Sequence, residues 1–179
     1  MLYQLYLVTV LVACVDSVVS AQNFSLYAYG TGITSGLQLF YGDGQAYVGT
    51  SAPSFLSQAV NITLSKSDDG TEFVASPNGT VDWTSQPTMY VDTTDGAMNA
   101  VGFVAGNETA PDGATVTGFG LYGGWAFHRD DSSSIEMKFI ASPTNETDVY
   151  LVKWNAGGTK SADDVAIALR TMAPVAISS

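Results

Sequence analysis

The sequence predicts an all-β protein, a single-domain antiparallel β-sandwich or barrel of about ten short strands with little helix outside the first residues. Three observations predict this fold. Apolar and polar residues alternate in short runs, glycine-containing turn sequences separate the runs, and few segments show the i, i+3, i+4 apolar spacing of a helix. Of the 179 residues, 46% are hydrophobic and 13% are charged, so the chain can bury a substantial core.

The first strand is expected at residues 24–29, where Phe24, Leu26 and Ala28 alternate with more polar positions. Two hairpins follow. Gly42-Asp43-Gly44 supplies the positive φ angles of a tight turn in the first hairpin, and Ser67–Gly70 forms the turn of the second. Their strands are expected at 37–41 and 45–48, and at 60–64 and 71–74.

The rest of the chain continues the same pattern of short runs. Four Asp-Gly pairs and Asn78-Gly79 mark turns between them. Further strands are expected at 88–91, 97–104, 115–121, 124–128, 135–140 and 149–154.

Residues 161–170 allow two interpretations. Ser161 followed by Asp164 is typical of a helix N-terminus. Val165, Ile167 and Leu169, however, alternate with alanines, and this period of two favours a closing strand over a helix.

An N-terminal signal peptide is predicted at residues 1–21. Residues 2–15 carry no charge, and small side chains follow at Ser17, Ser20 and Ala21. Cleavage is expected after Ala21, with Ser20 as the alternative. The apolar run of 14 residues is shorter than the roughly 20 that span a bilayer as a helix, so no permanent membrane anchor is expected.

Cleavage would leave residues 22–179 as one secreted all-β domain. It would remove Cys14, the only cysteine, so the secreted protein is expected to contain no disulfide. A domain of this size can be stable through packing alone. Residues 172–179 lack the long apolar tail of a glycolipid-anchor signal, so the product is expected to be released.

Glycosylation signals agree with a secretory route. Five of the seven asparagines after residue 21 fit the Asn-x-Ser/Thr acceptor pattern. This number exceeds what the Ser and Thr content would give by chance, although one or two of the sites are expected to stay unoccupied. The predicted acceptors are Asn23, Asn61, Asn78, Asn107 and Asn145.

The charge balance and the scarcity of reactive side chains exclude several functions. Asp and Glu number 17 against 6 for Lys and Arg, giving a net charge of −11, so nucleic acid is not an expected partner. With one histidine and one cysteine, no catalytic, cofactor or metal site is predicted. Pairs of aspartates such as Asp68-Asp69 and Asp130-Asp131 are interpreted as solvated turns rather than as parts of a calcium site.

A glycoside hydrolase is kept as the least favoured alternative, because its two carboxyl groups can come from distant strands. Glu72 and Glu136 are the glutamates in predicted strands. Glu136 is expected to face water together with Lys138, since its neighbours Ile135 and Met137 would then face the core. His128 is expected to be a hydrogen-bonded or exposed side chain.

Aromatic residues offer a binding surface instead. Their rings can stack on sugars when they project from the face of a β-sheet, although most are expected to lie in the core. Tyr27 and Tyr29 are the candidates for stacking on carbohydrate, because they alternate with the apolar face that contains Phe24 and Leu26.

Two segments of the chain also resemble a protein family. Residues 24–49, from Phe24-Ser-Leu-Tyr-Ala-Tyr to Tyr-Val-Gly49, and the C-terminal segment from Val149-Tyr-Leu-Val-Lys-Trp-Asn155 through Val165 to Pro174 resemble uncharacterised small secreted proteins of filamentous ascomycete fungi. The resemblance implies an extracellular or cell-wall-associated protein and assigns no residue a role.

The expected function is therefore that of a non-catalytic secreted glycoprotein. It is expected to be cell-wall-associated or effector-like, and to act by binding a surface such as wall polysaccharide or a host surface protein. The alternative is a lectin-like β-sandwich module that binds wall polysaccharide.

Overall fold

The computed structural model describes residues 22–106 and 108–175, and within these ranges the chain forms sixteen strands and no helix. The prediction of an all-β sandwich or barrel is confirmed. The predicted signal peptide and Asn107 lie outside the described residues. Accordingly, no helix long and apolar enough to cross a membrane occurs in the described ranges.

Six antiparallel strands close into a barrel. They hydrogen-bond in the order β2-β4-β5-β6-β8-β3, and β3 pairs back with β2. Because the ring is closed, each of its six strands pairs with a ring strand on both sides. The ring strands are β2 (Leu37–Gly42), β3 (Gln45–Gly49), β4 (Ala59–Lys66), β5 (Phe73–Pro77), β6 (Pro87–Asp92) and β8 (Gly102–Ala105).

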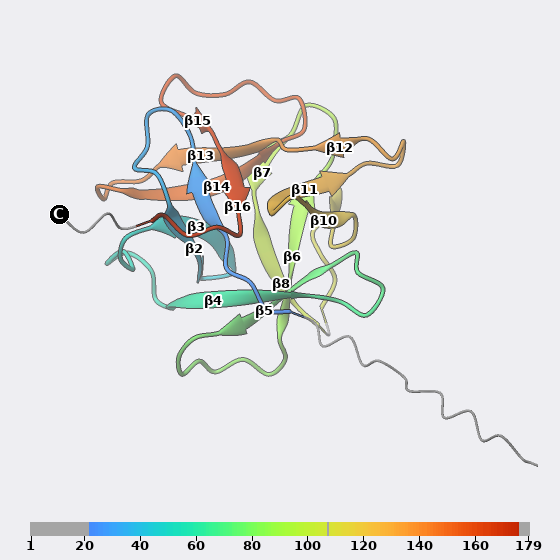
Figure 1. The fold of residues 1–179 in the computed structure, drawn as a ribbon, viewed down its shortest axis with the longest axis horizontal. Coiled ribbons are helices and arrows are strands. Elements are labelled where there is room, and N and C mark those ends of the chain that lie inside the picture. The colour runs from blue at the N-terminus through green and yellow to red at the C-terminus, as the bar shows by residue number, and fades with distance from the viewer. Residues whose placement is uncertain (1–21, 107, 176–179) are drawn as a thin grey trace, which may run out of the picture.

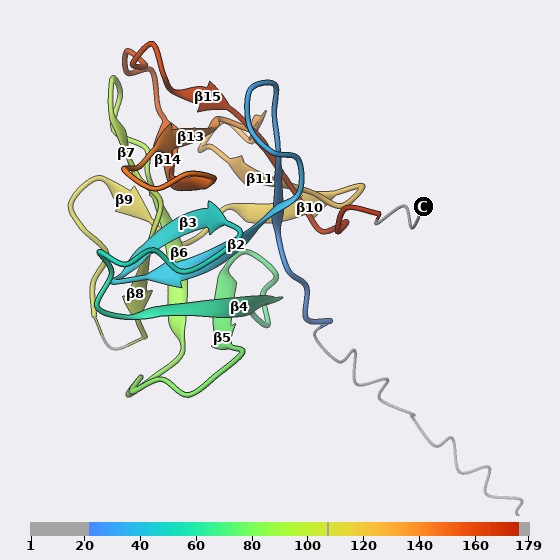
Figure 2. The same cartoon turned by 90° about the vertical axis from the view of Figure 1, so that its left-hand side faces the viewer.

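The remaining strands extend the sheet from two ring strands and add a short one to a third. From β2 the pairing continues through β1 (Tyr27–Tyr29), β16 (Ala168–Arg170), β11 (Trp125–Arg129) and β10 (Phe119–Tyr122), with β12 (Ile135–Glu136) also on β11. From β3 the pairing continues through β14 (Val149–Asn155) and β13 (Phe139–Pro143) to β15 (Val165–Ala166). The short strand β7 (Met98–Ala100) also pairs with β14, and β9 (Ala114–Thr115) pairs with β6. In two views at right angles, β4 and β5 lie at one end of the molecule and β13 and β15 at the other (Figures 1 and 2).

Sixteen strands appear where about ten were predicted, because several predicted strands change partner along their length. The run 97–104 is divided at Val101: β7 pairs with β14, whereas β8 pairs with β6 and β3. The runs 115–121 and 135–140 are divided in the same way. The sheet bends where a strand changes its pairing partner. Alternation of apolar and polar residues does not show at which residue that change occurs.

The ambiguous segment 161–170 ends in strands, as its alternation predicted. β15 and β16 lie on either side of buried Ile167. The Ser161 N–H does donate to the Asp164 carboxylate at 2.8 Å, but the segment forms a turn instead of a helix.

The first predicted hairpin is confirmed, with Asp43 and Gly44 as its two turn residues. Both have positive φ, 43° and 85°, as a two-residue turn between twisted strands requires. The Asp43 carboxylate also accepts the N–H groups of Ser57 and Gln58 at 2.8 and 2.7 Å. One aspartate therefore shapes the turn and fixes the loop that leads to β4.

A chain of aromatic contacts forms the centre of the core. Neighbouring ring centroids are 5.0 to 5.5 Å apart along the series. Such edge and offset contacts add to the stabilisation that burial itself provides. In order of contact the rings are Phe24, Phe73, Phe119, His128, Trp154 and Phe139.

Two glycines lie beneath aromatic rings on the neighbouring strand. Gly102 is paired with Tyr90 and Gly120 with Phe127. A Cβ added to either glycine would collide with that ring. The absence of a side chain at these positions lets each ring lie flat against the sheet.

Candidate functional site

Three aromatic side chains and one arginine form a row across the sheet from β10 to β1, which we call the aromatic row (Tyr122, Trp125, Arg170 and Tyr27). Tyr122 pairs with Trp125, Trp125 with Arg170, and Arg170 with Tyr27. Directly paired residues project from the same face of a sheet, so all four side chains share one face.

The aromatic row lies on the outer face of this sheet. The residues beside it, Ala126, Leu169 and Ala28, are buried in the core, and side chains alternate between the two faces along a strand. Tyr122 is 71% exposed, while Tyr27, Trp125 and Arg170 are half-buried. The strands β10 and β11 that carry two of the rings lie between the two ends of the molecule in both views (Figures 1 and 2).

Arg170 stands between two rings. Its guanidinium carbon lies 4.3 Å from the centre of the Trp125 ring and 5.4 Å from that of Tyr29. Cation–π attraction to the negative faces of the rings holds a guanidinium in such a position.

Tyr27 and Tyr29, the residues predicted to stack on sugar, have different surroundings. Both are half-buried on the outer face of β1, as the alternation predicted. The Tyr29 hydroxyl donates to the Met172 carbonyl at 2.8 Å, and Arg170 lies against its ring. Tyr29 is thus suited to holding Arg170 in place, whereas Tyr27 belongs to the aromatic row itself.

A groove of about 850 Å³ adjoins the aromatic row and shares Tyr27 with it. Its walls combine apolar side chains with hydroxyl, amide and ammonium groups and with the carboxylate of Asp68. This mixture suits a ligand that presents both hydroxyl groups and apolar ring faces. Residues from four separate parts of the chain line the groove, among them Phe24, Ser25, Lys66, Leu121 and Thr171.

His128 is a core residue and is not part of the aromatic row. It is 3% exposed and packs edge-on against Phe119 and Trp154. Its Nε2 lies 3.1 Å from the Thr117 carbonyl oxygen, and because a carbonyl only accepts, Nε2 carries the proton. Nδ1 is buried with no partner among the described residues. Burial lowers the pKa of the imidazole, against the opposing effects of the Thr117 carbonyl and nearby acidic groups.

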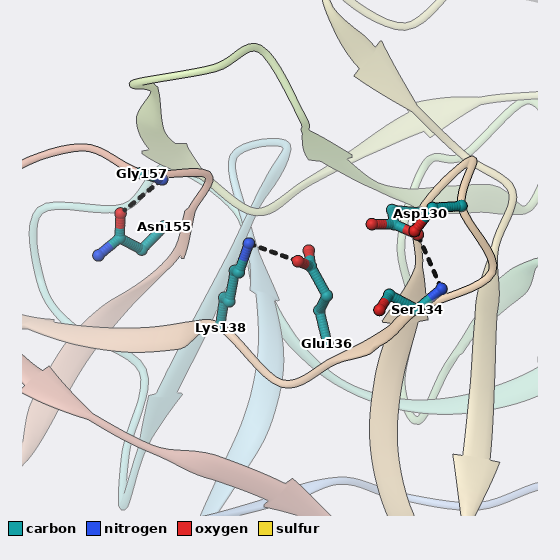
Figure 3. Close-up of polar contacts among 7 residues, drawn as sticks. Asp130, Ser134, Glu136, Lys138, Asn155 and Gly157 are labelled. Atoms are coloured by element: carbon teal, nitrogen blue, oxygen red, sulfur yellow. Dashed lines mark hydrogen bonds and ion pairs between the residues drawn. The ribbon is translucent and has the colours of Figure 1, made fainter.

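Glu136, one of the two glutamates considered for hydrolysis, and Asp130 of a predicted turn each have a local partner. Glu136 forms an ion pair with Lys138, and Asp130 accepts the Ser134 N–H at 2.8 Å, so that each side chain points to its own local partner (Figure 3). The Ser132 hydroxyl also donates to Asp130, and these hydrogen bonds lower the pKa of the Asp130 carboxyl.

The expected orientation around Glu136 is wrong. Ile135 and Met137 are 48% and 39% exposed instead of facing the core. β12 is only two residues long and pairs with β11 alone, so no second layer covers these apolar side chains.

The aspartates of the predicted turns also bind neighbouring donors. Asp69 accepts hydrogen bonds from Ser67 and Thr71, which lower the pKa of its carboxyl. Asp92 accepts from Thr94 and Asn99. In the part of the chain that the structure describes, no group of three or more His, Cys, Asp or Glu side chains could hold a metal ion.

A second pocket of about 330 Å³ lies beside the ring strands and was not predicted. Tyr41, Trp83 and Phe103 form its aromatic side, with Tyr41 and Trp83 edge to face at 4.9 Å. Asp82 and Glu108 are among its lining residues. They come from separate loops with no recognisable motif, so their proximity could not be predicted from the sequence.

The predicted glycosylation sites within the described residues all have exposed asparagines. Asn23, Asn61, Asn78 and Asn145 are exposed, and each can therefore present a glycan to solvent. The Asn78 N–H donates to the Asn61 carbonyl at 2.7 Å, so these two sites are neighbours.

Comparison with protein-family models, with curated proteins and with solved structures found no match. The resemblance to small secreted fungal proteins therefore stays a prediction from the sequence.

Proposed function

We propose that this protein is a non-catalytic secreted glycoprotein that binds carbohydrate, with cell-wall polysaccharide as the ligand, through the aromatic row and the groove beside it. The observation that supports this proposal is the in-register alignment of Tyr122, Trp125 and Tyr27 on one outer face. Rings arranged in this way can stack on successive sugar units, and polar groups in the groove can hydrogen-bond their hydroxyls.

Carbohydrate is a better match than a host surface protein. Stable protein interfaces have a broad apolar centre surrounded by a polar rim. On this face the exposed apolar surface is a narrow row with a cation at its middle, next to a groove whose walls are mixed polar and apolar. The lectin-like alternative is therefore the form of surface binding that we favour.

A pull-down on insoluble chitin, β-glucan and cellulose tests the proposal. The wild type is expected to be retained by at least one polymer, and the double variant Trp125→Ala, Tyr27→Ala to lose at least about tenfold in affinity, since stacked aromatic residues dominate such interfaces. Phe55→Ala is the matched control, because Phe55 is an exposed aromatic residue that packs against Tyr47, away from the aromatic row. Equal retention of all three proteins would refute the assignment of the site.

The non-catalytic part of the proposal has its own test. Reducing sugar released from the same polymers is measured alongside binding, with Glu108→Gln and Asp82→Asn as the variants, because both residues line the second pocket. No release above background is expected. Release that disappears in either variant would show a hydrolase acting at that pocket.

Secretion and glycosylation are tested on protein recovered from culture medium. An N-terminal sequence that begins at Gln22 is expected, together with a mass that falls on treatment with an N-glycosidase. Recovery of intact Met1 in unglycosylated protein would contradict this part of the proposal.

A further inference from the structure

Arg170 lies beside two aromatic rings. Trp125 and Tyr29 lie against its guanidinium group, at 4.3 and 5.4 Å from the guanidinium carbon. The donors of a guanidinium lie in its plane, so a partner that accepts two of its N–H bonds has to approach along its edge. A ligand must therefore meet Arg170 edge-on.

This arginine has no acidic partner within the fold. Among residues 22–106 and 108–175, the ion pair between Lys138 and Glu136 is the only one, although the protein has 17 acidic side chains. The Nε of Arg170 is buried and donates no hydrogen bond within the same residues. Because this Nε is closed off from solvent, a ligand would have to accept its hydrogen bonds from the two terminal nitrogens of the guanidinium.

We propose that the aromatic row selects a sugar that carries a carboxylate, a uronic acid unit of a polysaccharide, and that Arg170 is the residue that recognises it. The inference rests on the proposed carbohydrate function and specifies its ligand. A carboxylate is planar and accepts two parallel N–H bonds from the edge of a guanidinium, while the rings on either side contact the sugar.

The net charge of −11 sets the salt dependence of this binding. The protein as a whole repels a polyanion over long distances, and salt weakens that repulsion because the Debye length shrinks to about 10 Å at 0.1 M. The contact with half-buried Arg170 is short-range and is screened less. Affinity for a polyuronate is therefore expected to hold or rise as salt increases from low concentration, the opposite of binding through a basic patch.

The test compares polygalacturonate with its methyl-esterified form and with the neutral polymer that the wild type retains best. The wild type is expected to bind the free acid at least about tenfold more tightly than the ester. Arg170→Gln should abolish this preference, and Arg170→Lys should restore little of it, since an ammonium lacks the planar fork. Arg129→Gln is the matched control: Arg129 lies on the same face of β11, with its guanidinium carbon 5.8 Å from the Phe127 ring centre, and should leave the preference intact.

The outcomes separate this inference from the proposed function. Retention of neutral polymer that depends on Trp125, with no preference for the free acid, would overturn the inference and leave carbohydrate binding in place. Equal weakening of acid and ester by Arg170→Gln would show that Arg170 only positions the rings, and would also overturn it. Dextran sulfate binding as tightly, with the same dependence on Arg170, would refute the choice of a carboxylate. No retention of any polymer would defeat the proposed function and the inference together.

Discussion

His128 makes the stability of this fold sensitive to mild acid. Its Nε2–H donates to the Thr117 carbonyl, so protonation must occur at Nδ1, which is buried and has no acceptor among the described residues. Burial lowers the pKa of the folded imidazole, while Glu136, Asp130 and Asp131 oppose this effect without reversing it. The folded state therefore favours the neutral ring more strongly than the unfolded chain does.

The sign of the effect follows from proton linkage. Above the ordinary histidine pKa of 6.5 both states are neutral and the stabilisation is complete. As the pH falls from there toward the lowered folded pKa, the unfolded chain binds the proton first, and the free energy of unfolding decreases. A single proton gives a slope of at most about 1.4 kcal/mol per pH unit. Below the folded pKa the loss is constant.

Replacing His128 with phenylalanine should remove this slope. The ring keeps its edge-on contacts with Phe119 and Trp154, and it loses the hydrogen bond to Thr117 together with the unpaired Nδ1. These changes partly offset each other, so the variant is expected to lie within about 1.5 kcal/mol of the wild type near neutral pH. In mild acid the difference should shift in favour of the variant.

The assay is urea unfolding of both proteins, followed by circular dichroism at several pH values between about 8 and 5. The difference between the two free energies of unfolding is the informative quantity, because the carboxylates titrate in both proteins and cancel. A difference that is the same at every pH would refute the argument that buried His128 resists protonation.

Two further predictions concern the glycines and the first turn. Gly120→Ala should destabilise the protein by about 1–3 kcal/mol in urea unfolding, because the added Cβ collides with the Phe127 ring. Gly79→Ala is the control and should have little effect, since a Cβ there makes only one ordinary contact. Similar losses of stability in the two variants would contradict the packing argument. Asp43→Ala should lower the free energy of unfolding by about 1–2 kcal/mol and raise the protease sensitivity of the 50–58 loop, because two N–H groups lose their acceptor and alanine disfavours positive φ. Asp43→Asn should recover part of the lost stability. An Asp43→Ala variant as stable as the wild type would argue against this role of the carboxylate.

The sequence predicted those parts of the fold that depend on neighbouring residues. The turn at Asp43-Gly44 followed from its dipeptide, and the outward direction of Tyr27 followed from strict alternation with Leu26 and Ala28. Closure of the barrel was not predictable in the same way. It depends on β3 pairing with β8, and on β6 pairing with both β5 and β8, none of which leaves a local pattern.

The candidate site shows the same division. Tyr27 and Tyr29 could be identified from their own strand, but Trp125 and Arg170 join them only because β16 lies between β11 and β1. Trp125 carried a weak signal, since it alternates with Ala126 and His128 in a short strand after two glycines. Arg170 gave none, because a single cation at the end of an alternating run is normally a solvated surface residue.

The pairing of β1 with β16 also determines when the two parts of the molecule can form during synthesis. All six ring strands lie between residues 37 and 105, so the barrel has its strands once residue 105 has left the ribosome. The face with the aromatic row needs Tyr27 to meet Arg170, which is translated after all six ring strands. Until then β1 has only β2 as a neighbour and exposes an unpaired edge. A chain that stops short of β16 would thus keep the strands of its barrel but lack the centre of its candidate binding surface, which makes this surface a marker that β16 has been translated.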